Sequence, residues 1–246
     1  MIFKQIESGG DRNYAYLVAC EKTRYGAVVD PSPDVLRVID IIQGEGVEIK
    51  YVINTHLHSD HSQGNSNFIQ AEKGKQPVTF INCGPGTEVK DGQSLFVGEI
   101  KLEFIHTPGH TQDSVCIKVE DRLITGDTLF VGKVGGTYSD DDAKTEFESL
   151  KKIMTLNTNT EVWPGHNYGV KPDSTIGFEL ENNPFIQRLE DFEEFLWLKQ
   201  NWARYKQEHG ISYGDIHPYL LRGLFPLPEL TLFYGDIEPF PEVFRL

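Results

Sequence analysis

The run THLHSDH at residues 55–61 limits most strongly what this chain can fold into. It places three histidines and one aspartate within six positions, at the end of IKYVINT, whose β-branched residues predict a buried strand. Each desolvated imidazole needs a polar partner, so the run is a poor component of an apolar core. Imidazole and carboxylate groups are common ligands of zinc and iron. The run therefore predicts a divalent metal site at the carboxyl end of a strand, where open α/β sheets place their chemistry.

Three later segments each offer one further candidate ligand. His110 lies in HTPGHT, Asp127 lies in TGDTLF and His166 lies in WPGH, each at the end of a strand-like run and beside a glycine. Because His56 and His58 would point alternately on an extended loop, the first cluster could serve two adjacent metal ions. Four such placements in one chain indicate a single metal centre assembled from four segments.

Composition and charge disfavour several classes of protein. The 246 residues carry a formal net charge of −14 without a visible basic stretch, so no nucleic-acid partner is expected. No run approaches the about 18 apolar residues of a membrane span, and the N-terminus lacks the apolar core of a signal peptide. We therefore expect no membrane contact and a cytoplasmic location. The three cysteines are too widely spaced for a disulfide framework, and Cys20 and Cys116 are expected to be buried thiols.

The secondary-structure pattern is mixed. The first half reads as strand, strand, helix and strand over YAYLVA, YGAVVD, PDVLRVIDIIQ and IKYVINT, which predicts a layered α/β arrangement. The middle, QPVTFIN, SLFVGEIKLEFIHT and SVCIKVEDRLITGD, reads as antiparallel strands joined by tight turns such as KDGQ. A helix is predicted over Asp140–Met154, with acidic residues first and lysines last, and a short strand, TEVWPGH, follows it.

The C-terminal quarter differs in texture from the rest. From residue 184 onward one long amphipathic helix is predicted, with Phe185, Leu189 and Phe192 among the apolar residues at helical spacing. The proline-rich aromatic tail beyond it is predicted to be extended. Such an apolar tail must be buried, either as a cap on the core or in a homodimer contact. We therefore expect a catalytic domain over residues 1–180 and an appendage over residues 181–246.

The four motifs HxHxDH, PGHT, GDTLF and PGH, in this order, resemble those of the metallo-β-lactamase superfamily. The long spacings and the GDTLF form are most similar to the glyoxalase II (hydroxyacylglutathione hydrolase) branch and its relative, persulfide dioxygenase. The resemblance extends from about Asn13 to Pro184. It implies an α/β (α+β) fold, a four-layer αββα sandwich with the metals at one edge, followed by a C-terminal helical and extended appendage.

The resemblance also implies which residues bind which metal. Three residues would hold the first ion: His56, His58 and His110. Three would hold the second ion: Asp60, His61 and His166. Asp127 would bridge the two divalent ions, which we expect to be zinc, with iron or manganese as alternatives. His106 is not one of the family positions.

For the reaction, the resemblance implies a metal-dependent hydrolase that cleaves a thioester such as acyl-glutathione. A metal-held hydroxide would attack the acyl carbon, with Asp60 and Asp127 as catalytic carboxylates, and the thiolate would leave without a strong general acid. The alternative is a persulfide dioxygenase, in which His56, His110 and Asp127 alone would hold one iron ion. A non-catalytic binding module is a third hypothesis, disfavoured because all seven ligand positions are filled.

The loop after GDTLF, with the sequence FVGKVGGTY, is expected to contact the substrate. Both resembled enzymes carry a lysine or an arginine where this chain has Gly136. Tyr138 matches a tyrosine that contacts glutathione in glyoxalase II, and Lys133 is a candidate substitute cation. The alternatives are a packed tyrosine and a solvated lysine. No basic glutathione contacts are recognisable in residues 185–246, so another thiol carrier is an open alternative.

Overall fold

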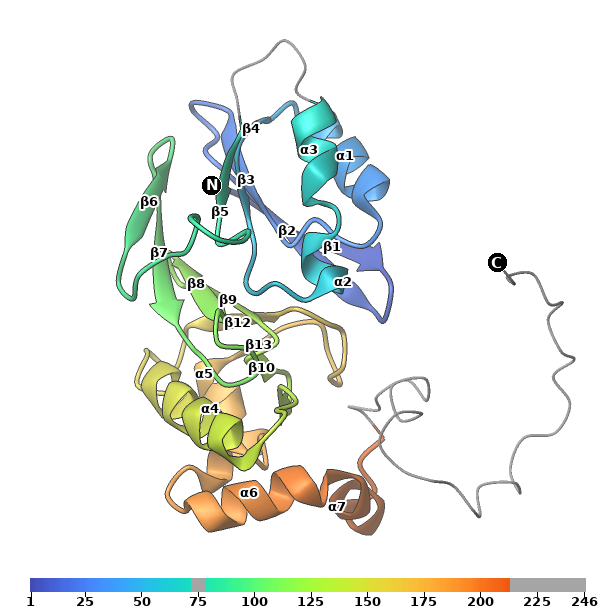
Figure 1. Ribbon diagram of the computed structural model, residues 1–246, viewed down its shortest axis with the longest axis vertical. Helices are drawn as coiled ribbons and strands as arrows, with labels where there is room; N and C mark the ends of the chain where they lie inside the picture. The colour runs from blue at the N-terminus through green and yellow to red at the C-terminus, as the bar shows by residue number, and fades with distance from the viewer. Residues whose placement is uncertain (72–77, 213–246) are drawn as a thin grey trace, which may run out of the picture. The chain divides into compact units, whose positions relative to one another are not determined.

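The computed structural model describes residues 1–71 and 78–212. Two β-sheets pack face to face, and helices cover the outer face of each sheet (Figure 1). The helices that pack on these outer faces are α1 (Val35–Gly44), α3 (Asn65–Ala71), α4 (Asp140–Ile153) and α5 (Ile176–Asn182). The first two cover one sheet and the last two cover the other. This four-layer arrangement confirms the predicted αββα sandwich and the predicted helix at residue 140.

The first sheet contains five strands in chain order: β1 (Ile2–Gly9), β2 (Asn13–Ala19), β3 (Tyr25–Val29), β4 (Glu48–Ile53) and β5 (Thr79–Ile81). β1 to β3 are antiparallel, whereas β3, β4 and β5 run parallel. The segment QPVTFIN is therefore a parallel strand, and its predicted antiparallel pairing is wrong. The reason is the helical crossover between β4 and β5, which returns the chain in the same direction. β3 and β4 end at one edge, where Asn54 contacts Asp30.

The second sheet has the order β13-β12-β9-β8-β7-β6. Its strands are β6 (Ser94–Val97), β7 (Ile100–His106), β8 (Val115–Val119), β9 (Arg122–Gly126), β12 (Glu161–Pro164) and β13 (Ser174–Thr175). β6 to β9 form the predicted antiparallel meander, and β12 lies parallel to β9. Asp127 and His166 follow β9 and β12 directly and so reach the same edge. A short hairpin, β10 (Leu129–Phe130) and β11 (Lys133–Val134), follows Asp127.

Large side chains from both sheets fill the space between them, and Tyr16 and Phe104 are fully buried there. The Tyr16 hydroxyl donates a hydrogen bond to the Pro164 carbonyl at 2.5 Å, which satisfies a polar atom that burial would otherwise penalise. The backbone N–H of Tyr14 donates to the Gly165 carbonyl at 2.8 Å. These bonds join the two sheets at the edge where the candidate ligands gather.

The C-terminal segment, residues 185–209, is not the single long helix predicted from its periodicity. It consists of a 3-10 turn and two helices: η1 (Ile186–Arg188), α6 (Phe192–Gln200) and α7 (Trp202–His209). Asp191 interrupts the helix, because its carboxylate accepts hydrogen bonds from the backbone N–H groups of Glu193 and Glu194 and starts a new helix there. Local capping thus overrides the continuous apolar pattern.

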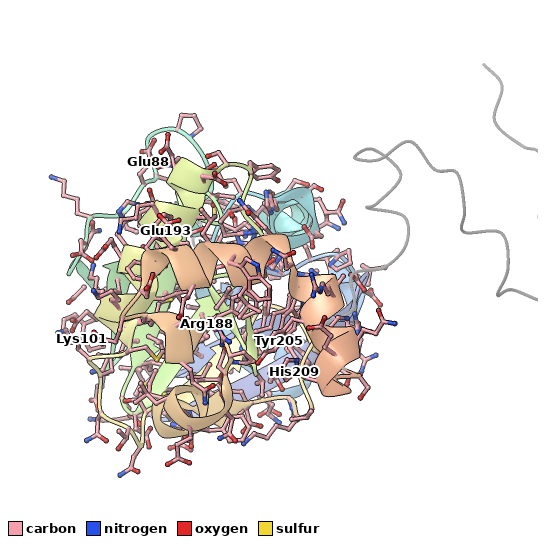
Figure 2. All side chains as sticks on the ribbon, turned by 90° about the horizontal axis from the view of Figure 1, so that it is seen from below. Glu88, Lys101, Arg188, Glu193, Tyr205 and His209 are labelled. Carbon is pink, nitrogen blue, oxygen red and sulfur yellow. The ribbon has the colours of Figure 1, made fainter. Side chains whose placement is uncertain are left out.

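The C-terminal segment packs on the second sheet through α4. Phe195 and Leu198 of α6 are fully buried in one cluster with Phe147 of α4. Figure 2 shows α6 and α7 across this face, where the Arg188 guanidinium lies 5.3 Å from the centre of the Tyr205 ring. The segment is therefore part of the folded core and not a separate arm.

Some predictions fall on residues outside the described ranges. The extended proline-rich tail and its homodimer contact lie there and stay predictions. The domain boundary after residue 180 lies within the described residues and also stays a prediction. Cys20 and Cys116 are buried free thiols, as predicted. Within residues 1–71 and 78–212, no helix is both long enough and apolar enough to cross a bilayer.

Candidate metal centre

The first group of candidate ligand atoms comes from the loop after β4 and the Pro-Gly turn after β7. His56 Nε2 lies 3.1 Å from His58 Nδ1, which lies 3.0 Å from His110 Nε2. The three rings meet edge to face, so their nitrogen atoms converge. His56 is buried, whereas His58 and His110 are half-buried. This group is therefore accessible from one side.

The second group comes from α2 (Ser59–Ser62) and the turn after β12. His61 Nε2 lies 3.1 Å from His166 Nε2, and Asp60 Oδ2 lies 3.4 Å from the same atom of His166. The Asn13 amide donates to Asp60 Oδ2 at 3.0 Å and holds this carboxylate toward the histidines. Both histidines are buried, but the Asp60 side chain is 42% exposed. Asp60 therefore faces solvent at the open side.

Asp127 lies between the two groups. Its Oδ1 is 3.4 Å from His61 Nε2, and its Oδ2 is 3.6 Å from His110 Nε2 and 3.4 Å from His166 Nε2. Burial raises the pKa of Asp127, but the charges of His166 and His61 outweigh burial and hold it well below its usual range. Oδ1 is buried without a hydrogen-bond partner in the described residues. Such a carboxylate requires compensating positive charge.

The seven converging side chains are better suited to binding divalent metal ions than to forming hydrogen bonds with one another. Two neutral imidazole nitrogens in contact can share only one proton, so a close set of them cannot be satisfied by mutual hydrogen bonds. The ligand atoms form three triads, each within 4.8 Å: His56, His58 and His110; His56, His61 and Asp127; Asp60, His61 and His166. Nitrogen and oxygen donors of this kind suit zinc, iron and manganese. All seven predicted ligands thus meet at one edge of the sandwich.

Asp30, just past β3, was not among the predicted site residues, yet it holds the first ligand loop. Its carboxylate accepts hydrogen bonds from the Thr55 N–H at 2.8 Å and the Thr55 hydroxyl at 2.6 Å. The same carboxylate lies 3.0 Å from His61 Nδ1. Its backbone φ is 49°, in the left-handed region that aspartate tolerates better than most residues. Its only sequence signal is an aspartate at the end of YGAVVD.

Backbone carbonyls fix the tautomers of two candidate ligands. His110 Nδ1 lies 2.7 Å from the Gly136 carbonyl, and His166 Nδ1 lies 2.8 Å from the Asp11 carbonyl. A carbonyl only accepts hydrogen bonds, so both Nδ1 atoms carry the proton. Both Nε2 atoms are then free to bind a metal ion.

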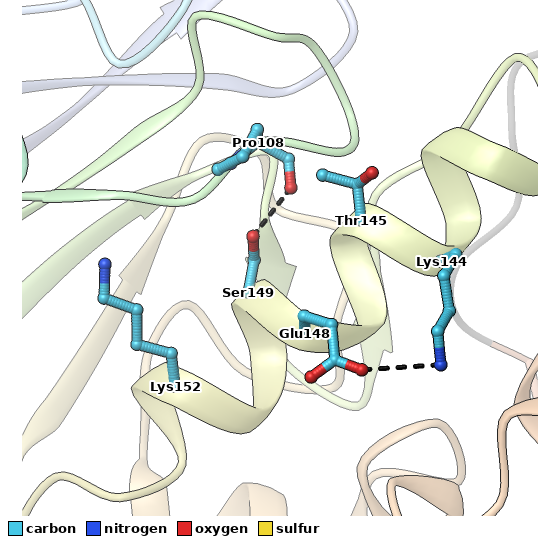
Figure 3. Close-up of a pocket in the computed structure, with 6 residues that line it drawn as sticks. All are labelled: Pro108, Lys144, Thr145, Glu148, Ser149 and Lys152. Atoms are coloured by element: carbon cyan, nitrogen blue, oxygen red, sulfur yellow. Dashed lines mark hydrogen bonds and ion pairs between the residues drawn. The ribbon is translucent and has the colours of Figure 1, made fainter.

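The turn that carries His110 is held against α4. The Ser149 hydroxyl donates to the Pro108 carbonyl at 2.7 Å (Figure 3). Gly109 has a φ of 142°, and a Cβ at this position would lie 2.4 Å from the Cα of Glu146. Glycine is therefore required for this close approach of turn and helix. This contact between the turn and α4 therefore fixes the position of His110.

The two predicted substrate contacts lie in different surroundings. Tyr138 is 80% exposed, and its hydroxyl lies 3.2 Å from His58 Nε2, at the open side of the site. Lys133 is buried and not solvated, and its Nζ lies 5.1 Å from the centre of the Tyr168 ring. Burial lowers the pKa of Lys133 to about 8, although Asp127 opposes this shift. Within the described residues its ammonium group makes no hydrogen bond or ion pair.

Tyr168 forms a wall beside the second ligand group and was also missed from sequence. Its ring stacks on His166 with 4.6 Å between ring centres and 9° between planes, and its hydroxyl donates to Asp11 Oδ2 at 2.8 Å. The Arg12 guanidinium lies 4.7 Å from the same ring. Tyr168 therefore contacts two cations, Lys133 and Arg12, of which Arg12 also lies 3.5 Å from Asp11 Oδ1.

Comparisons with known proteins place this chain among metal-dependent hydrolases and related folds by similarity. The sequence profile of the Metallo-beta-lactamase superfamily matches residues 8–79 and 69–166. Probable hydroxyacylglutathione hydrolase glo2 of Schizosaccharomyces pombe is 31% identical over 194 residues, which cover 75% of each chain. Probable polyketide biosynthesis zinc-dependent hydrolase BaeB of Bacillus velezensis is 29% identical and covers 81% of this chain and 90% of its own. The crystal structure of ETHE1 from Myxococcus xanthus has a TM-score of 0.73, with 29% identity, and covers 82% of this chain and 91% of its own.

Replacement of the Asp30 carboxylate tests its supporting role. Asp30→Asn should weaken zinc binding about 10- to 100-fold, because an uncharged amide with one acceptor oxygen replaces the carboxylate that serves Thr55 and His61 with two. The measurement is titration of the metal-free protein with zinc against a chromophoric chelator. Asp40→Asn, which alters an exposed acid on α1, is the matched control and should bind zinc like the wild type. An unchanged zinc affinity of the Asp30 variant would refute this role.

Proposed function

Because the chain belongs to the metallo-β-lactamase superfamily, we propose that its seven converging side chains bind two divalent metal ions, with zinc as the first candidate. One ion would be held by three histidines: His56, His58 and His110. The other would be held by Asp60, His61 and His166. The observation that carries this proposal is the position of Asp127, whose two oxygens face imidazoles of both groups. Asp127 would thus bridge the two ions.

The reaction that such a centre supports best is thioester hydrolysis by a hydrolase of the glyoxalase II type. Bound metal ions supply a hydroxide near neutral pH and polarise the acyl carbonyl. Asp60, which is 42% exposed, and Asp127 would accept hydrogen bonds from the attacking water and orient it. A thiolate leaves readily near neutral pH, so no strong acid is required beside the sulfur. The relative named as a hydroxyacylglutathione hydrolase supports this reaction.

Tyr138 and Lys133 would recognise the thiol half of the substrate. The exposed Tyr138 hydroxyl can bond a group that enters beside His58. The buried Lys133 ammonium would gain the anionic partner that the described residues do not provide. A carboxylate-bearing thiol fits both features.

Acyl-glutathione is therefore our first candidate substrate, and an ester of another anionic thiol carrier is the second. The relative named for polyketide biosynthesis supports keeping the second candidate. We place the reaction in the cytoplasm, where such thiols are kept reduced.

Gly136 allows a direct test of glutathione as the thiol. No atom lies within 4 Å of a Cβ built there, so a side chain can start from this position without a clash at Cβ. Gly136→Lys restores a cation where the resembled enzymes carry one. It should lower the KM for acyl-glutathione about five-fold, on the scale of one exposed ion pair. Steady-state kinetics at low ionic strength measure the change.

Gly136→Met is the matched control, since it adds a side chain of similar length without a charge. With a thioester of a short uncharged thiol, both variants should show the wild-type KM. Equal KM values of the two variants for acyl-glutathione would contradict glutathione as the thiol, while hydrolysis itself would remain supported by the activity of the wild type.

The alternative is a persulfide dioxygenase, which would need only His56, His110 and Asp127, and the similarity to ETHE1 is compatible with it. His166→Ala separates the two reactions, because His166 belongs only to the second ligand group. For the hydrolase, kcat with acyl-glutathione should fall about 100-fold or more when this ligand is lost. Oxygen uptake with glutathione persulfide would persist in this variant if the dioxygenase reaction were correct.

His106→Ala is the control for this experiment, because His106 lies outside all three ligand triads. Its ring contacts the Gln112 carbonyl at 2.9 Å, away from the ligand atoms. The control should keep the wild-type kcat. Full thioester hydrolysis by the His166 variant would overturn the two-metal hydrolase.

A further inference from the structure

We propose that Lys199 of α6 is a positioning residue of the site, which anchors the loop from Gly135 to Tyr138 and through it the ring of His110. This assigns the C-terminal segment an active part in the site as well as a part in the core. The inference rests on the proposed function, since it concerns how well the same centre is held.

The Lys199 ammonium is placed between helix α4 and the substrate loop. It donates a hydrogen bond to the Gly135 carbonyl at 2.8 Å and forms an ion pair with Glu146 of α4. The side chains of Lys199 and Glu146 are only 9% and 1% exposed. Both partners are therefore held away from solvent, in a fixed geometry.

Glu146 links this ion pair to two segments: the Pro-Gly turn that carries His110 and the substrate loop that contacts it. Its backbone packs against Gly109, the residue before His110, where a Cβ would lie 2.4 Å away. Its Oε1 lies 3.0 Å from the position that a Cβ on Gly135 would occupy. Glu146 is thus enclosed between the Pro-Gly turn and the substrate loop, and Lys199 fixes it there.

The next peptide of the loop acts on the ligand itself. The Gly136 carbonyl lies 2.7 Å from His110 Nδ1 and selects the tautomer whose Nε2 can bind a metal. Two residues further on, the Tyr138 hydroxyl lies 3.2 Å from His58 Nε2. The Lys199 contact therefore stands one residue from the group that orients His110 and three residues from a proposed substrate contact.

Stability alone does not account for a buried ion pair of this kind. Removing two charges from water is costly, and apolar residues of similar volume often stabilise a fold as well or better. The cost is visible at Glu146, whose pKa is raised to about 7 by burial even though Lys199 opposes the shift. What an apolar pair could not provide is the directed hydrogen bond to Gly135. This bond favours a role in positioning the loop.

The test removes the ion pair without leaving a lone buried charge. In the double variant Lys199→Met/Glu146→Gln, glutamine has the length of glutamate and methionine is one atom shorter than lysine. Circular dichroism checks that the chain folds. We expect kcat/KM for acyl-glutathione to fall about 10- to 100-fold, as is usual when support of a metal ligand is lost. Lys199→Arg, which keeps the charge and the donors, should recover most of this loss.

A readout independent of turnover follows the ligand directly. The visible spectrum of the cobalt(II)-loaded protein reports the geometry of the metal ligands, and we expect it to differ between the double variant and the wild type. The matched control is Lys144→Met/Glu148→Gln, which removes the exposed ion pair on the same helix drawn in Figure 3. This control should retain the wild-type spectrum and kcat/KM within two-fold.

A double variant with wild-type kcat/KM and a wild-type cobalt spectrum would overturn the role of Lys199 and leave the proposed function intact. A wild-type protein that hydrolyses no thioester would overturn the proposed function, while the cobalt spectra would still decide whether Lys199 supports His110.

Discussion

A buried carboxylate between two groups of imidazoles is the interaction on which this site depends. The protein alone does not satisfy Asp127: one of its oxygens lacks a donor within the described residues, and its nearest neighbours are the nitrogens that a metal would use. Bound cations would supply the compensating charge. The fold makes this possible because the parallel pairs β3–β4 and β9–β12 end at the same edge, so residues from distant parts of the chain meet there.

The groups around the candidate ligands determine how firmly these side chains are held at that edge. Asp30 holds His61, the Gly136 carbonyl holds His110, and each leaves the opposite ring nitrogen free for a metal. Support extends outward from there, from the Gly135–Gly136 peptides to Glu146 on α4 and Lys199 on α6. Segments that are far apart in the sequence therefore help to position the same few imidazole nitrogens. The C-terminal segment is coupled to the chemistry through packing and through one directed hydrogen bond.

The convergence of the seven candidate ligands was predictable from sequence, because the four segments that carry them each follow a strand-like run. Asp30 was not, since an aspartate after a strand is common and only the fold brings it to His61. The sequence left Lys133 open as either a substrate contact or a solvated charge. It is buried beside Tyr168, whose hydroxyl donates a hydrogen bond to Asp11, far away in the sequence. The prediction of one long C-terminal helix was wrong, because the periodicity of apolar residues carries no information about a capping aspartate such as Asp191.

The central claim is that two metal ions share this edge through Asp127. Elemental analysis of the protein, purified without added metal and before contact with a chelator, tests it most directly. The account predicts about two divalent ions per chain, as zinc or as a mixture of zinc and iron. About one iron per chain, with no second ion taken up when zinc is supplied, would contradict the two-metal centre and favour the mononuclear dioxygenase.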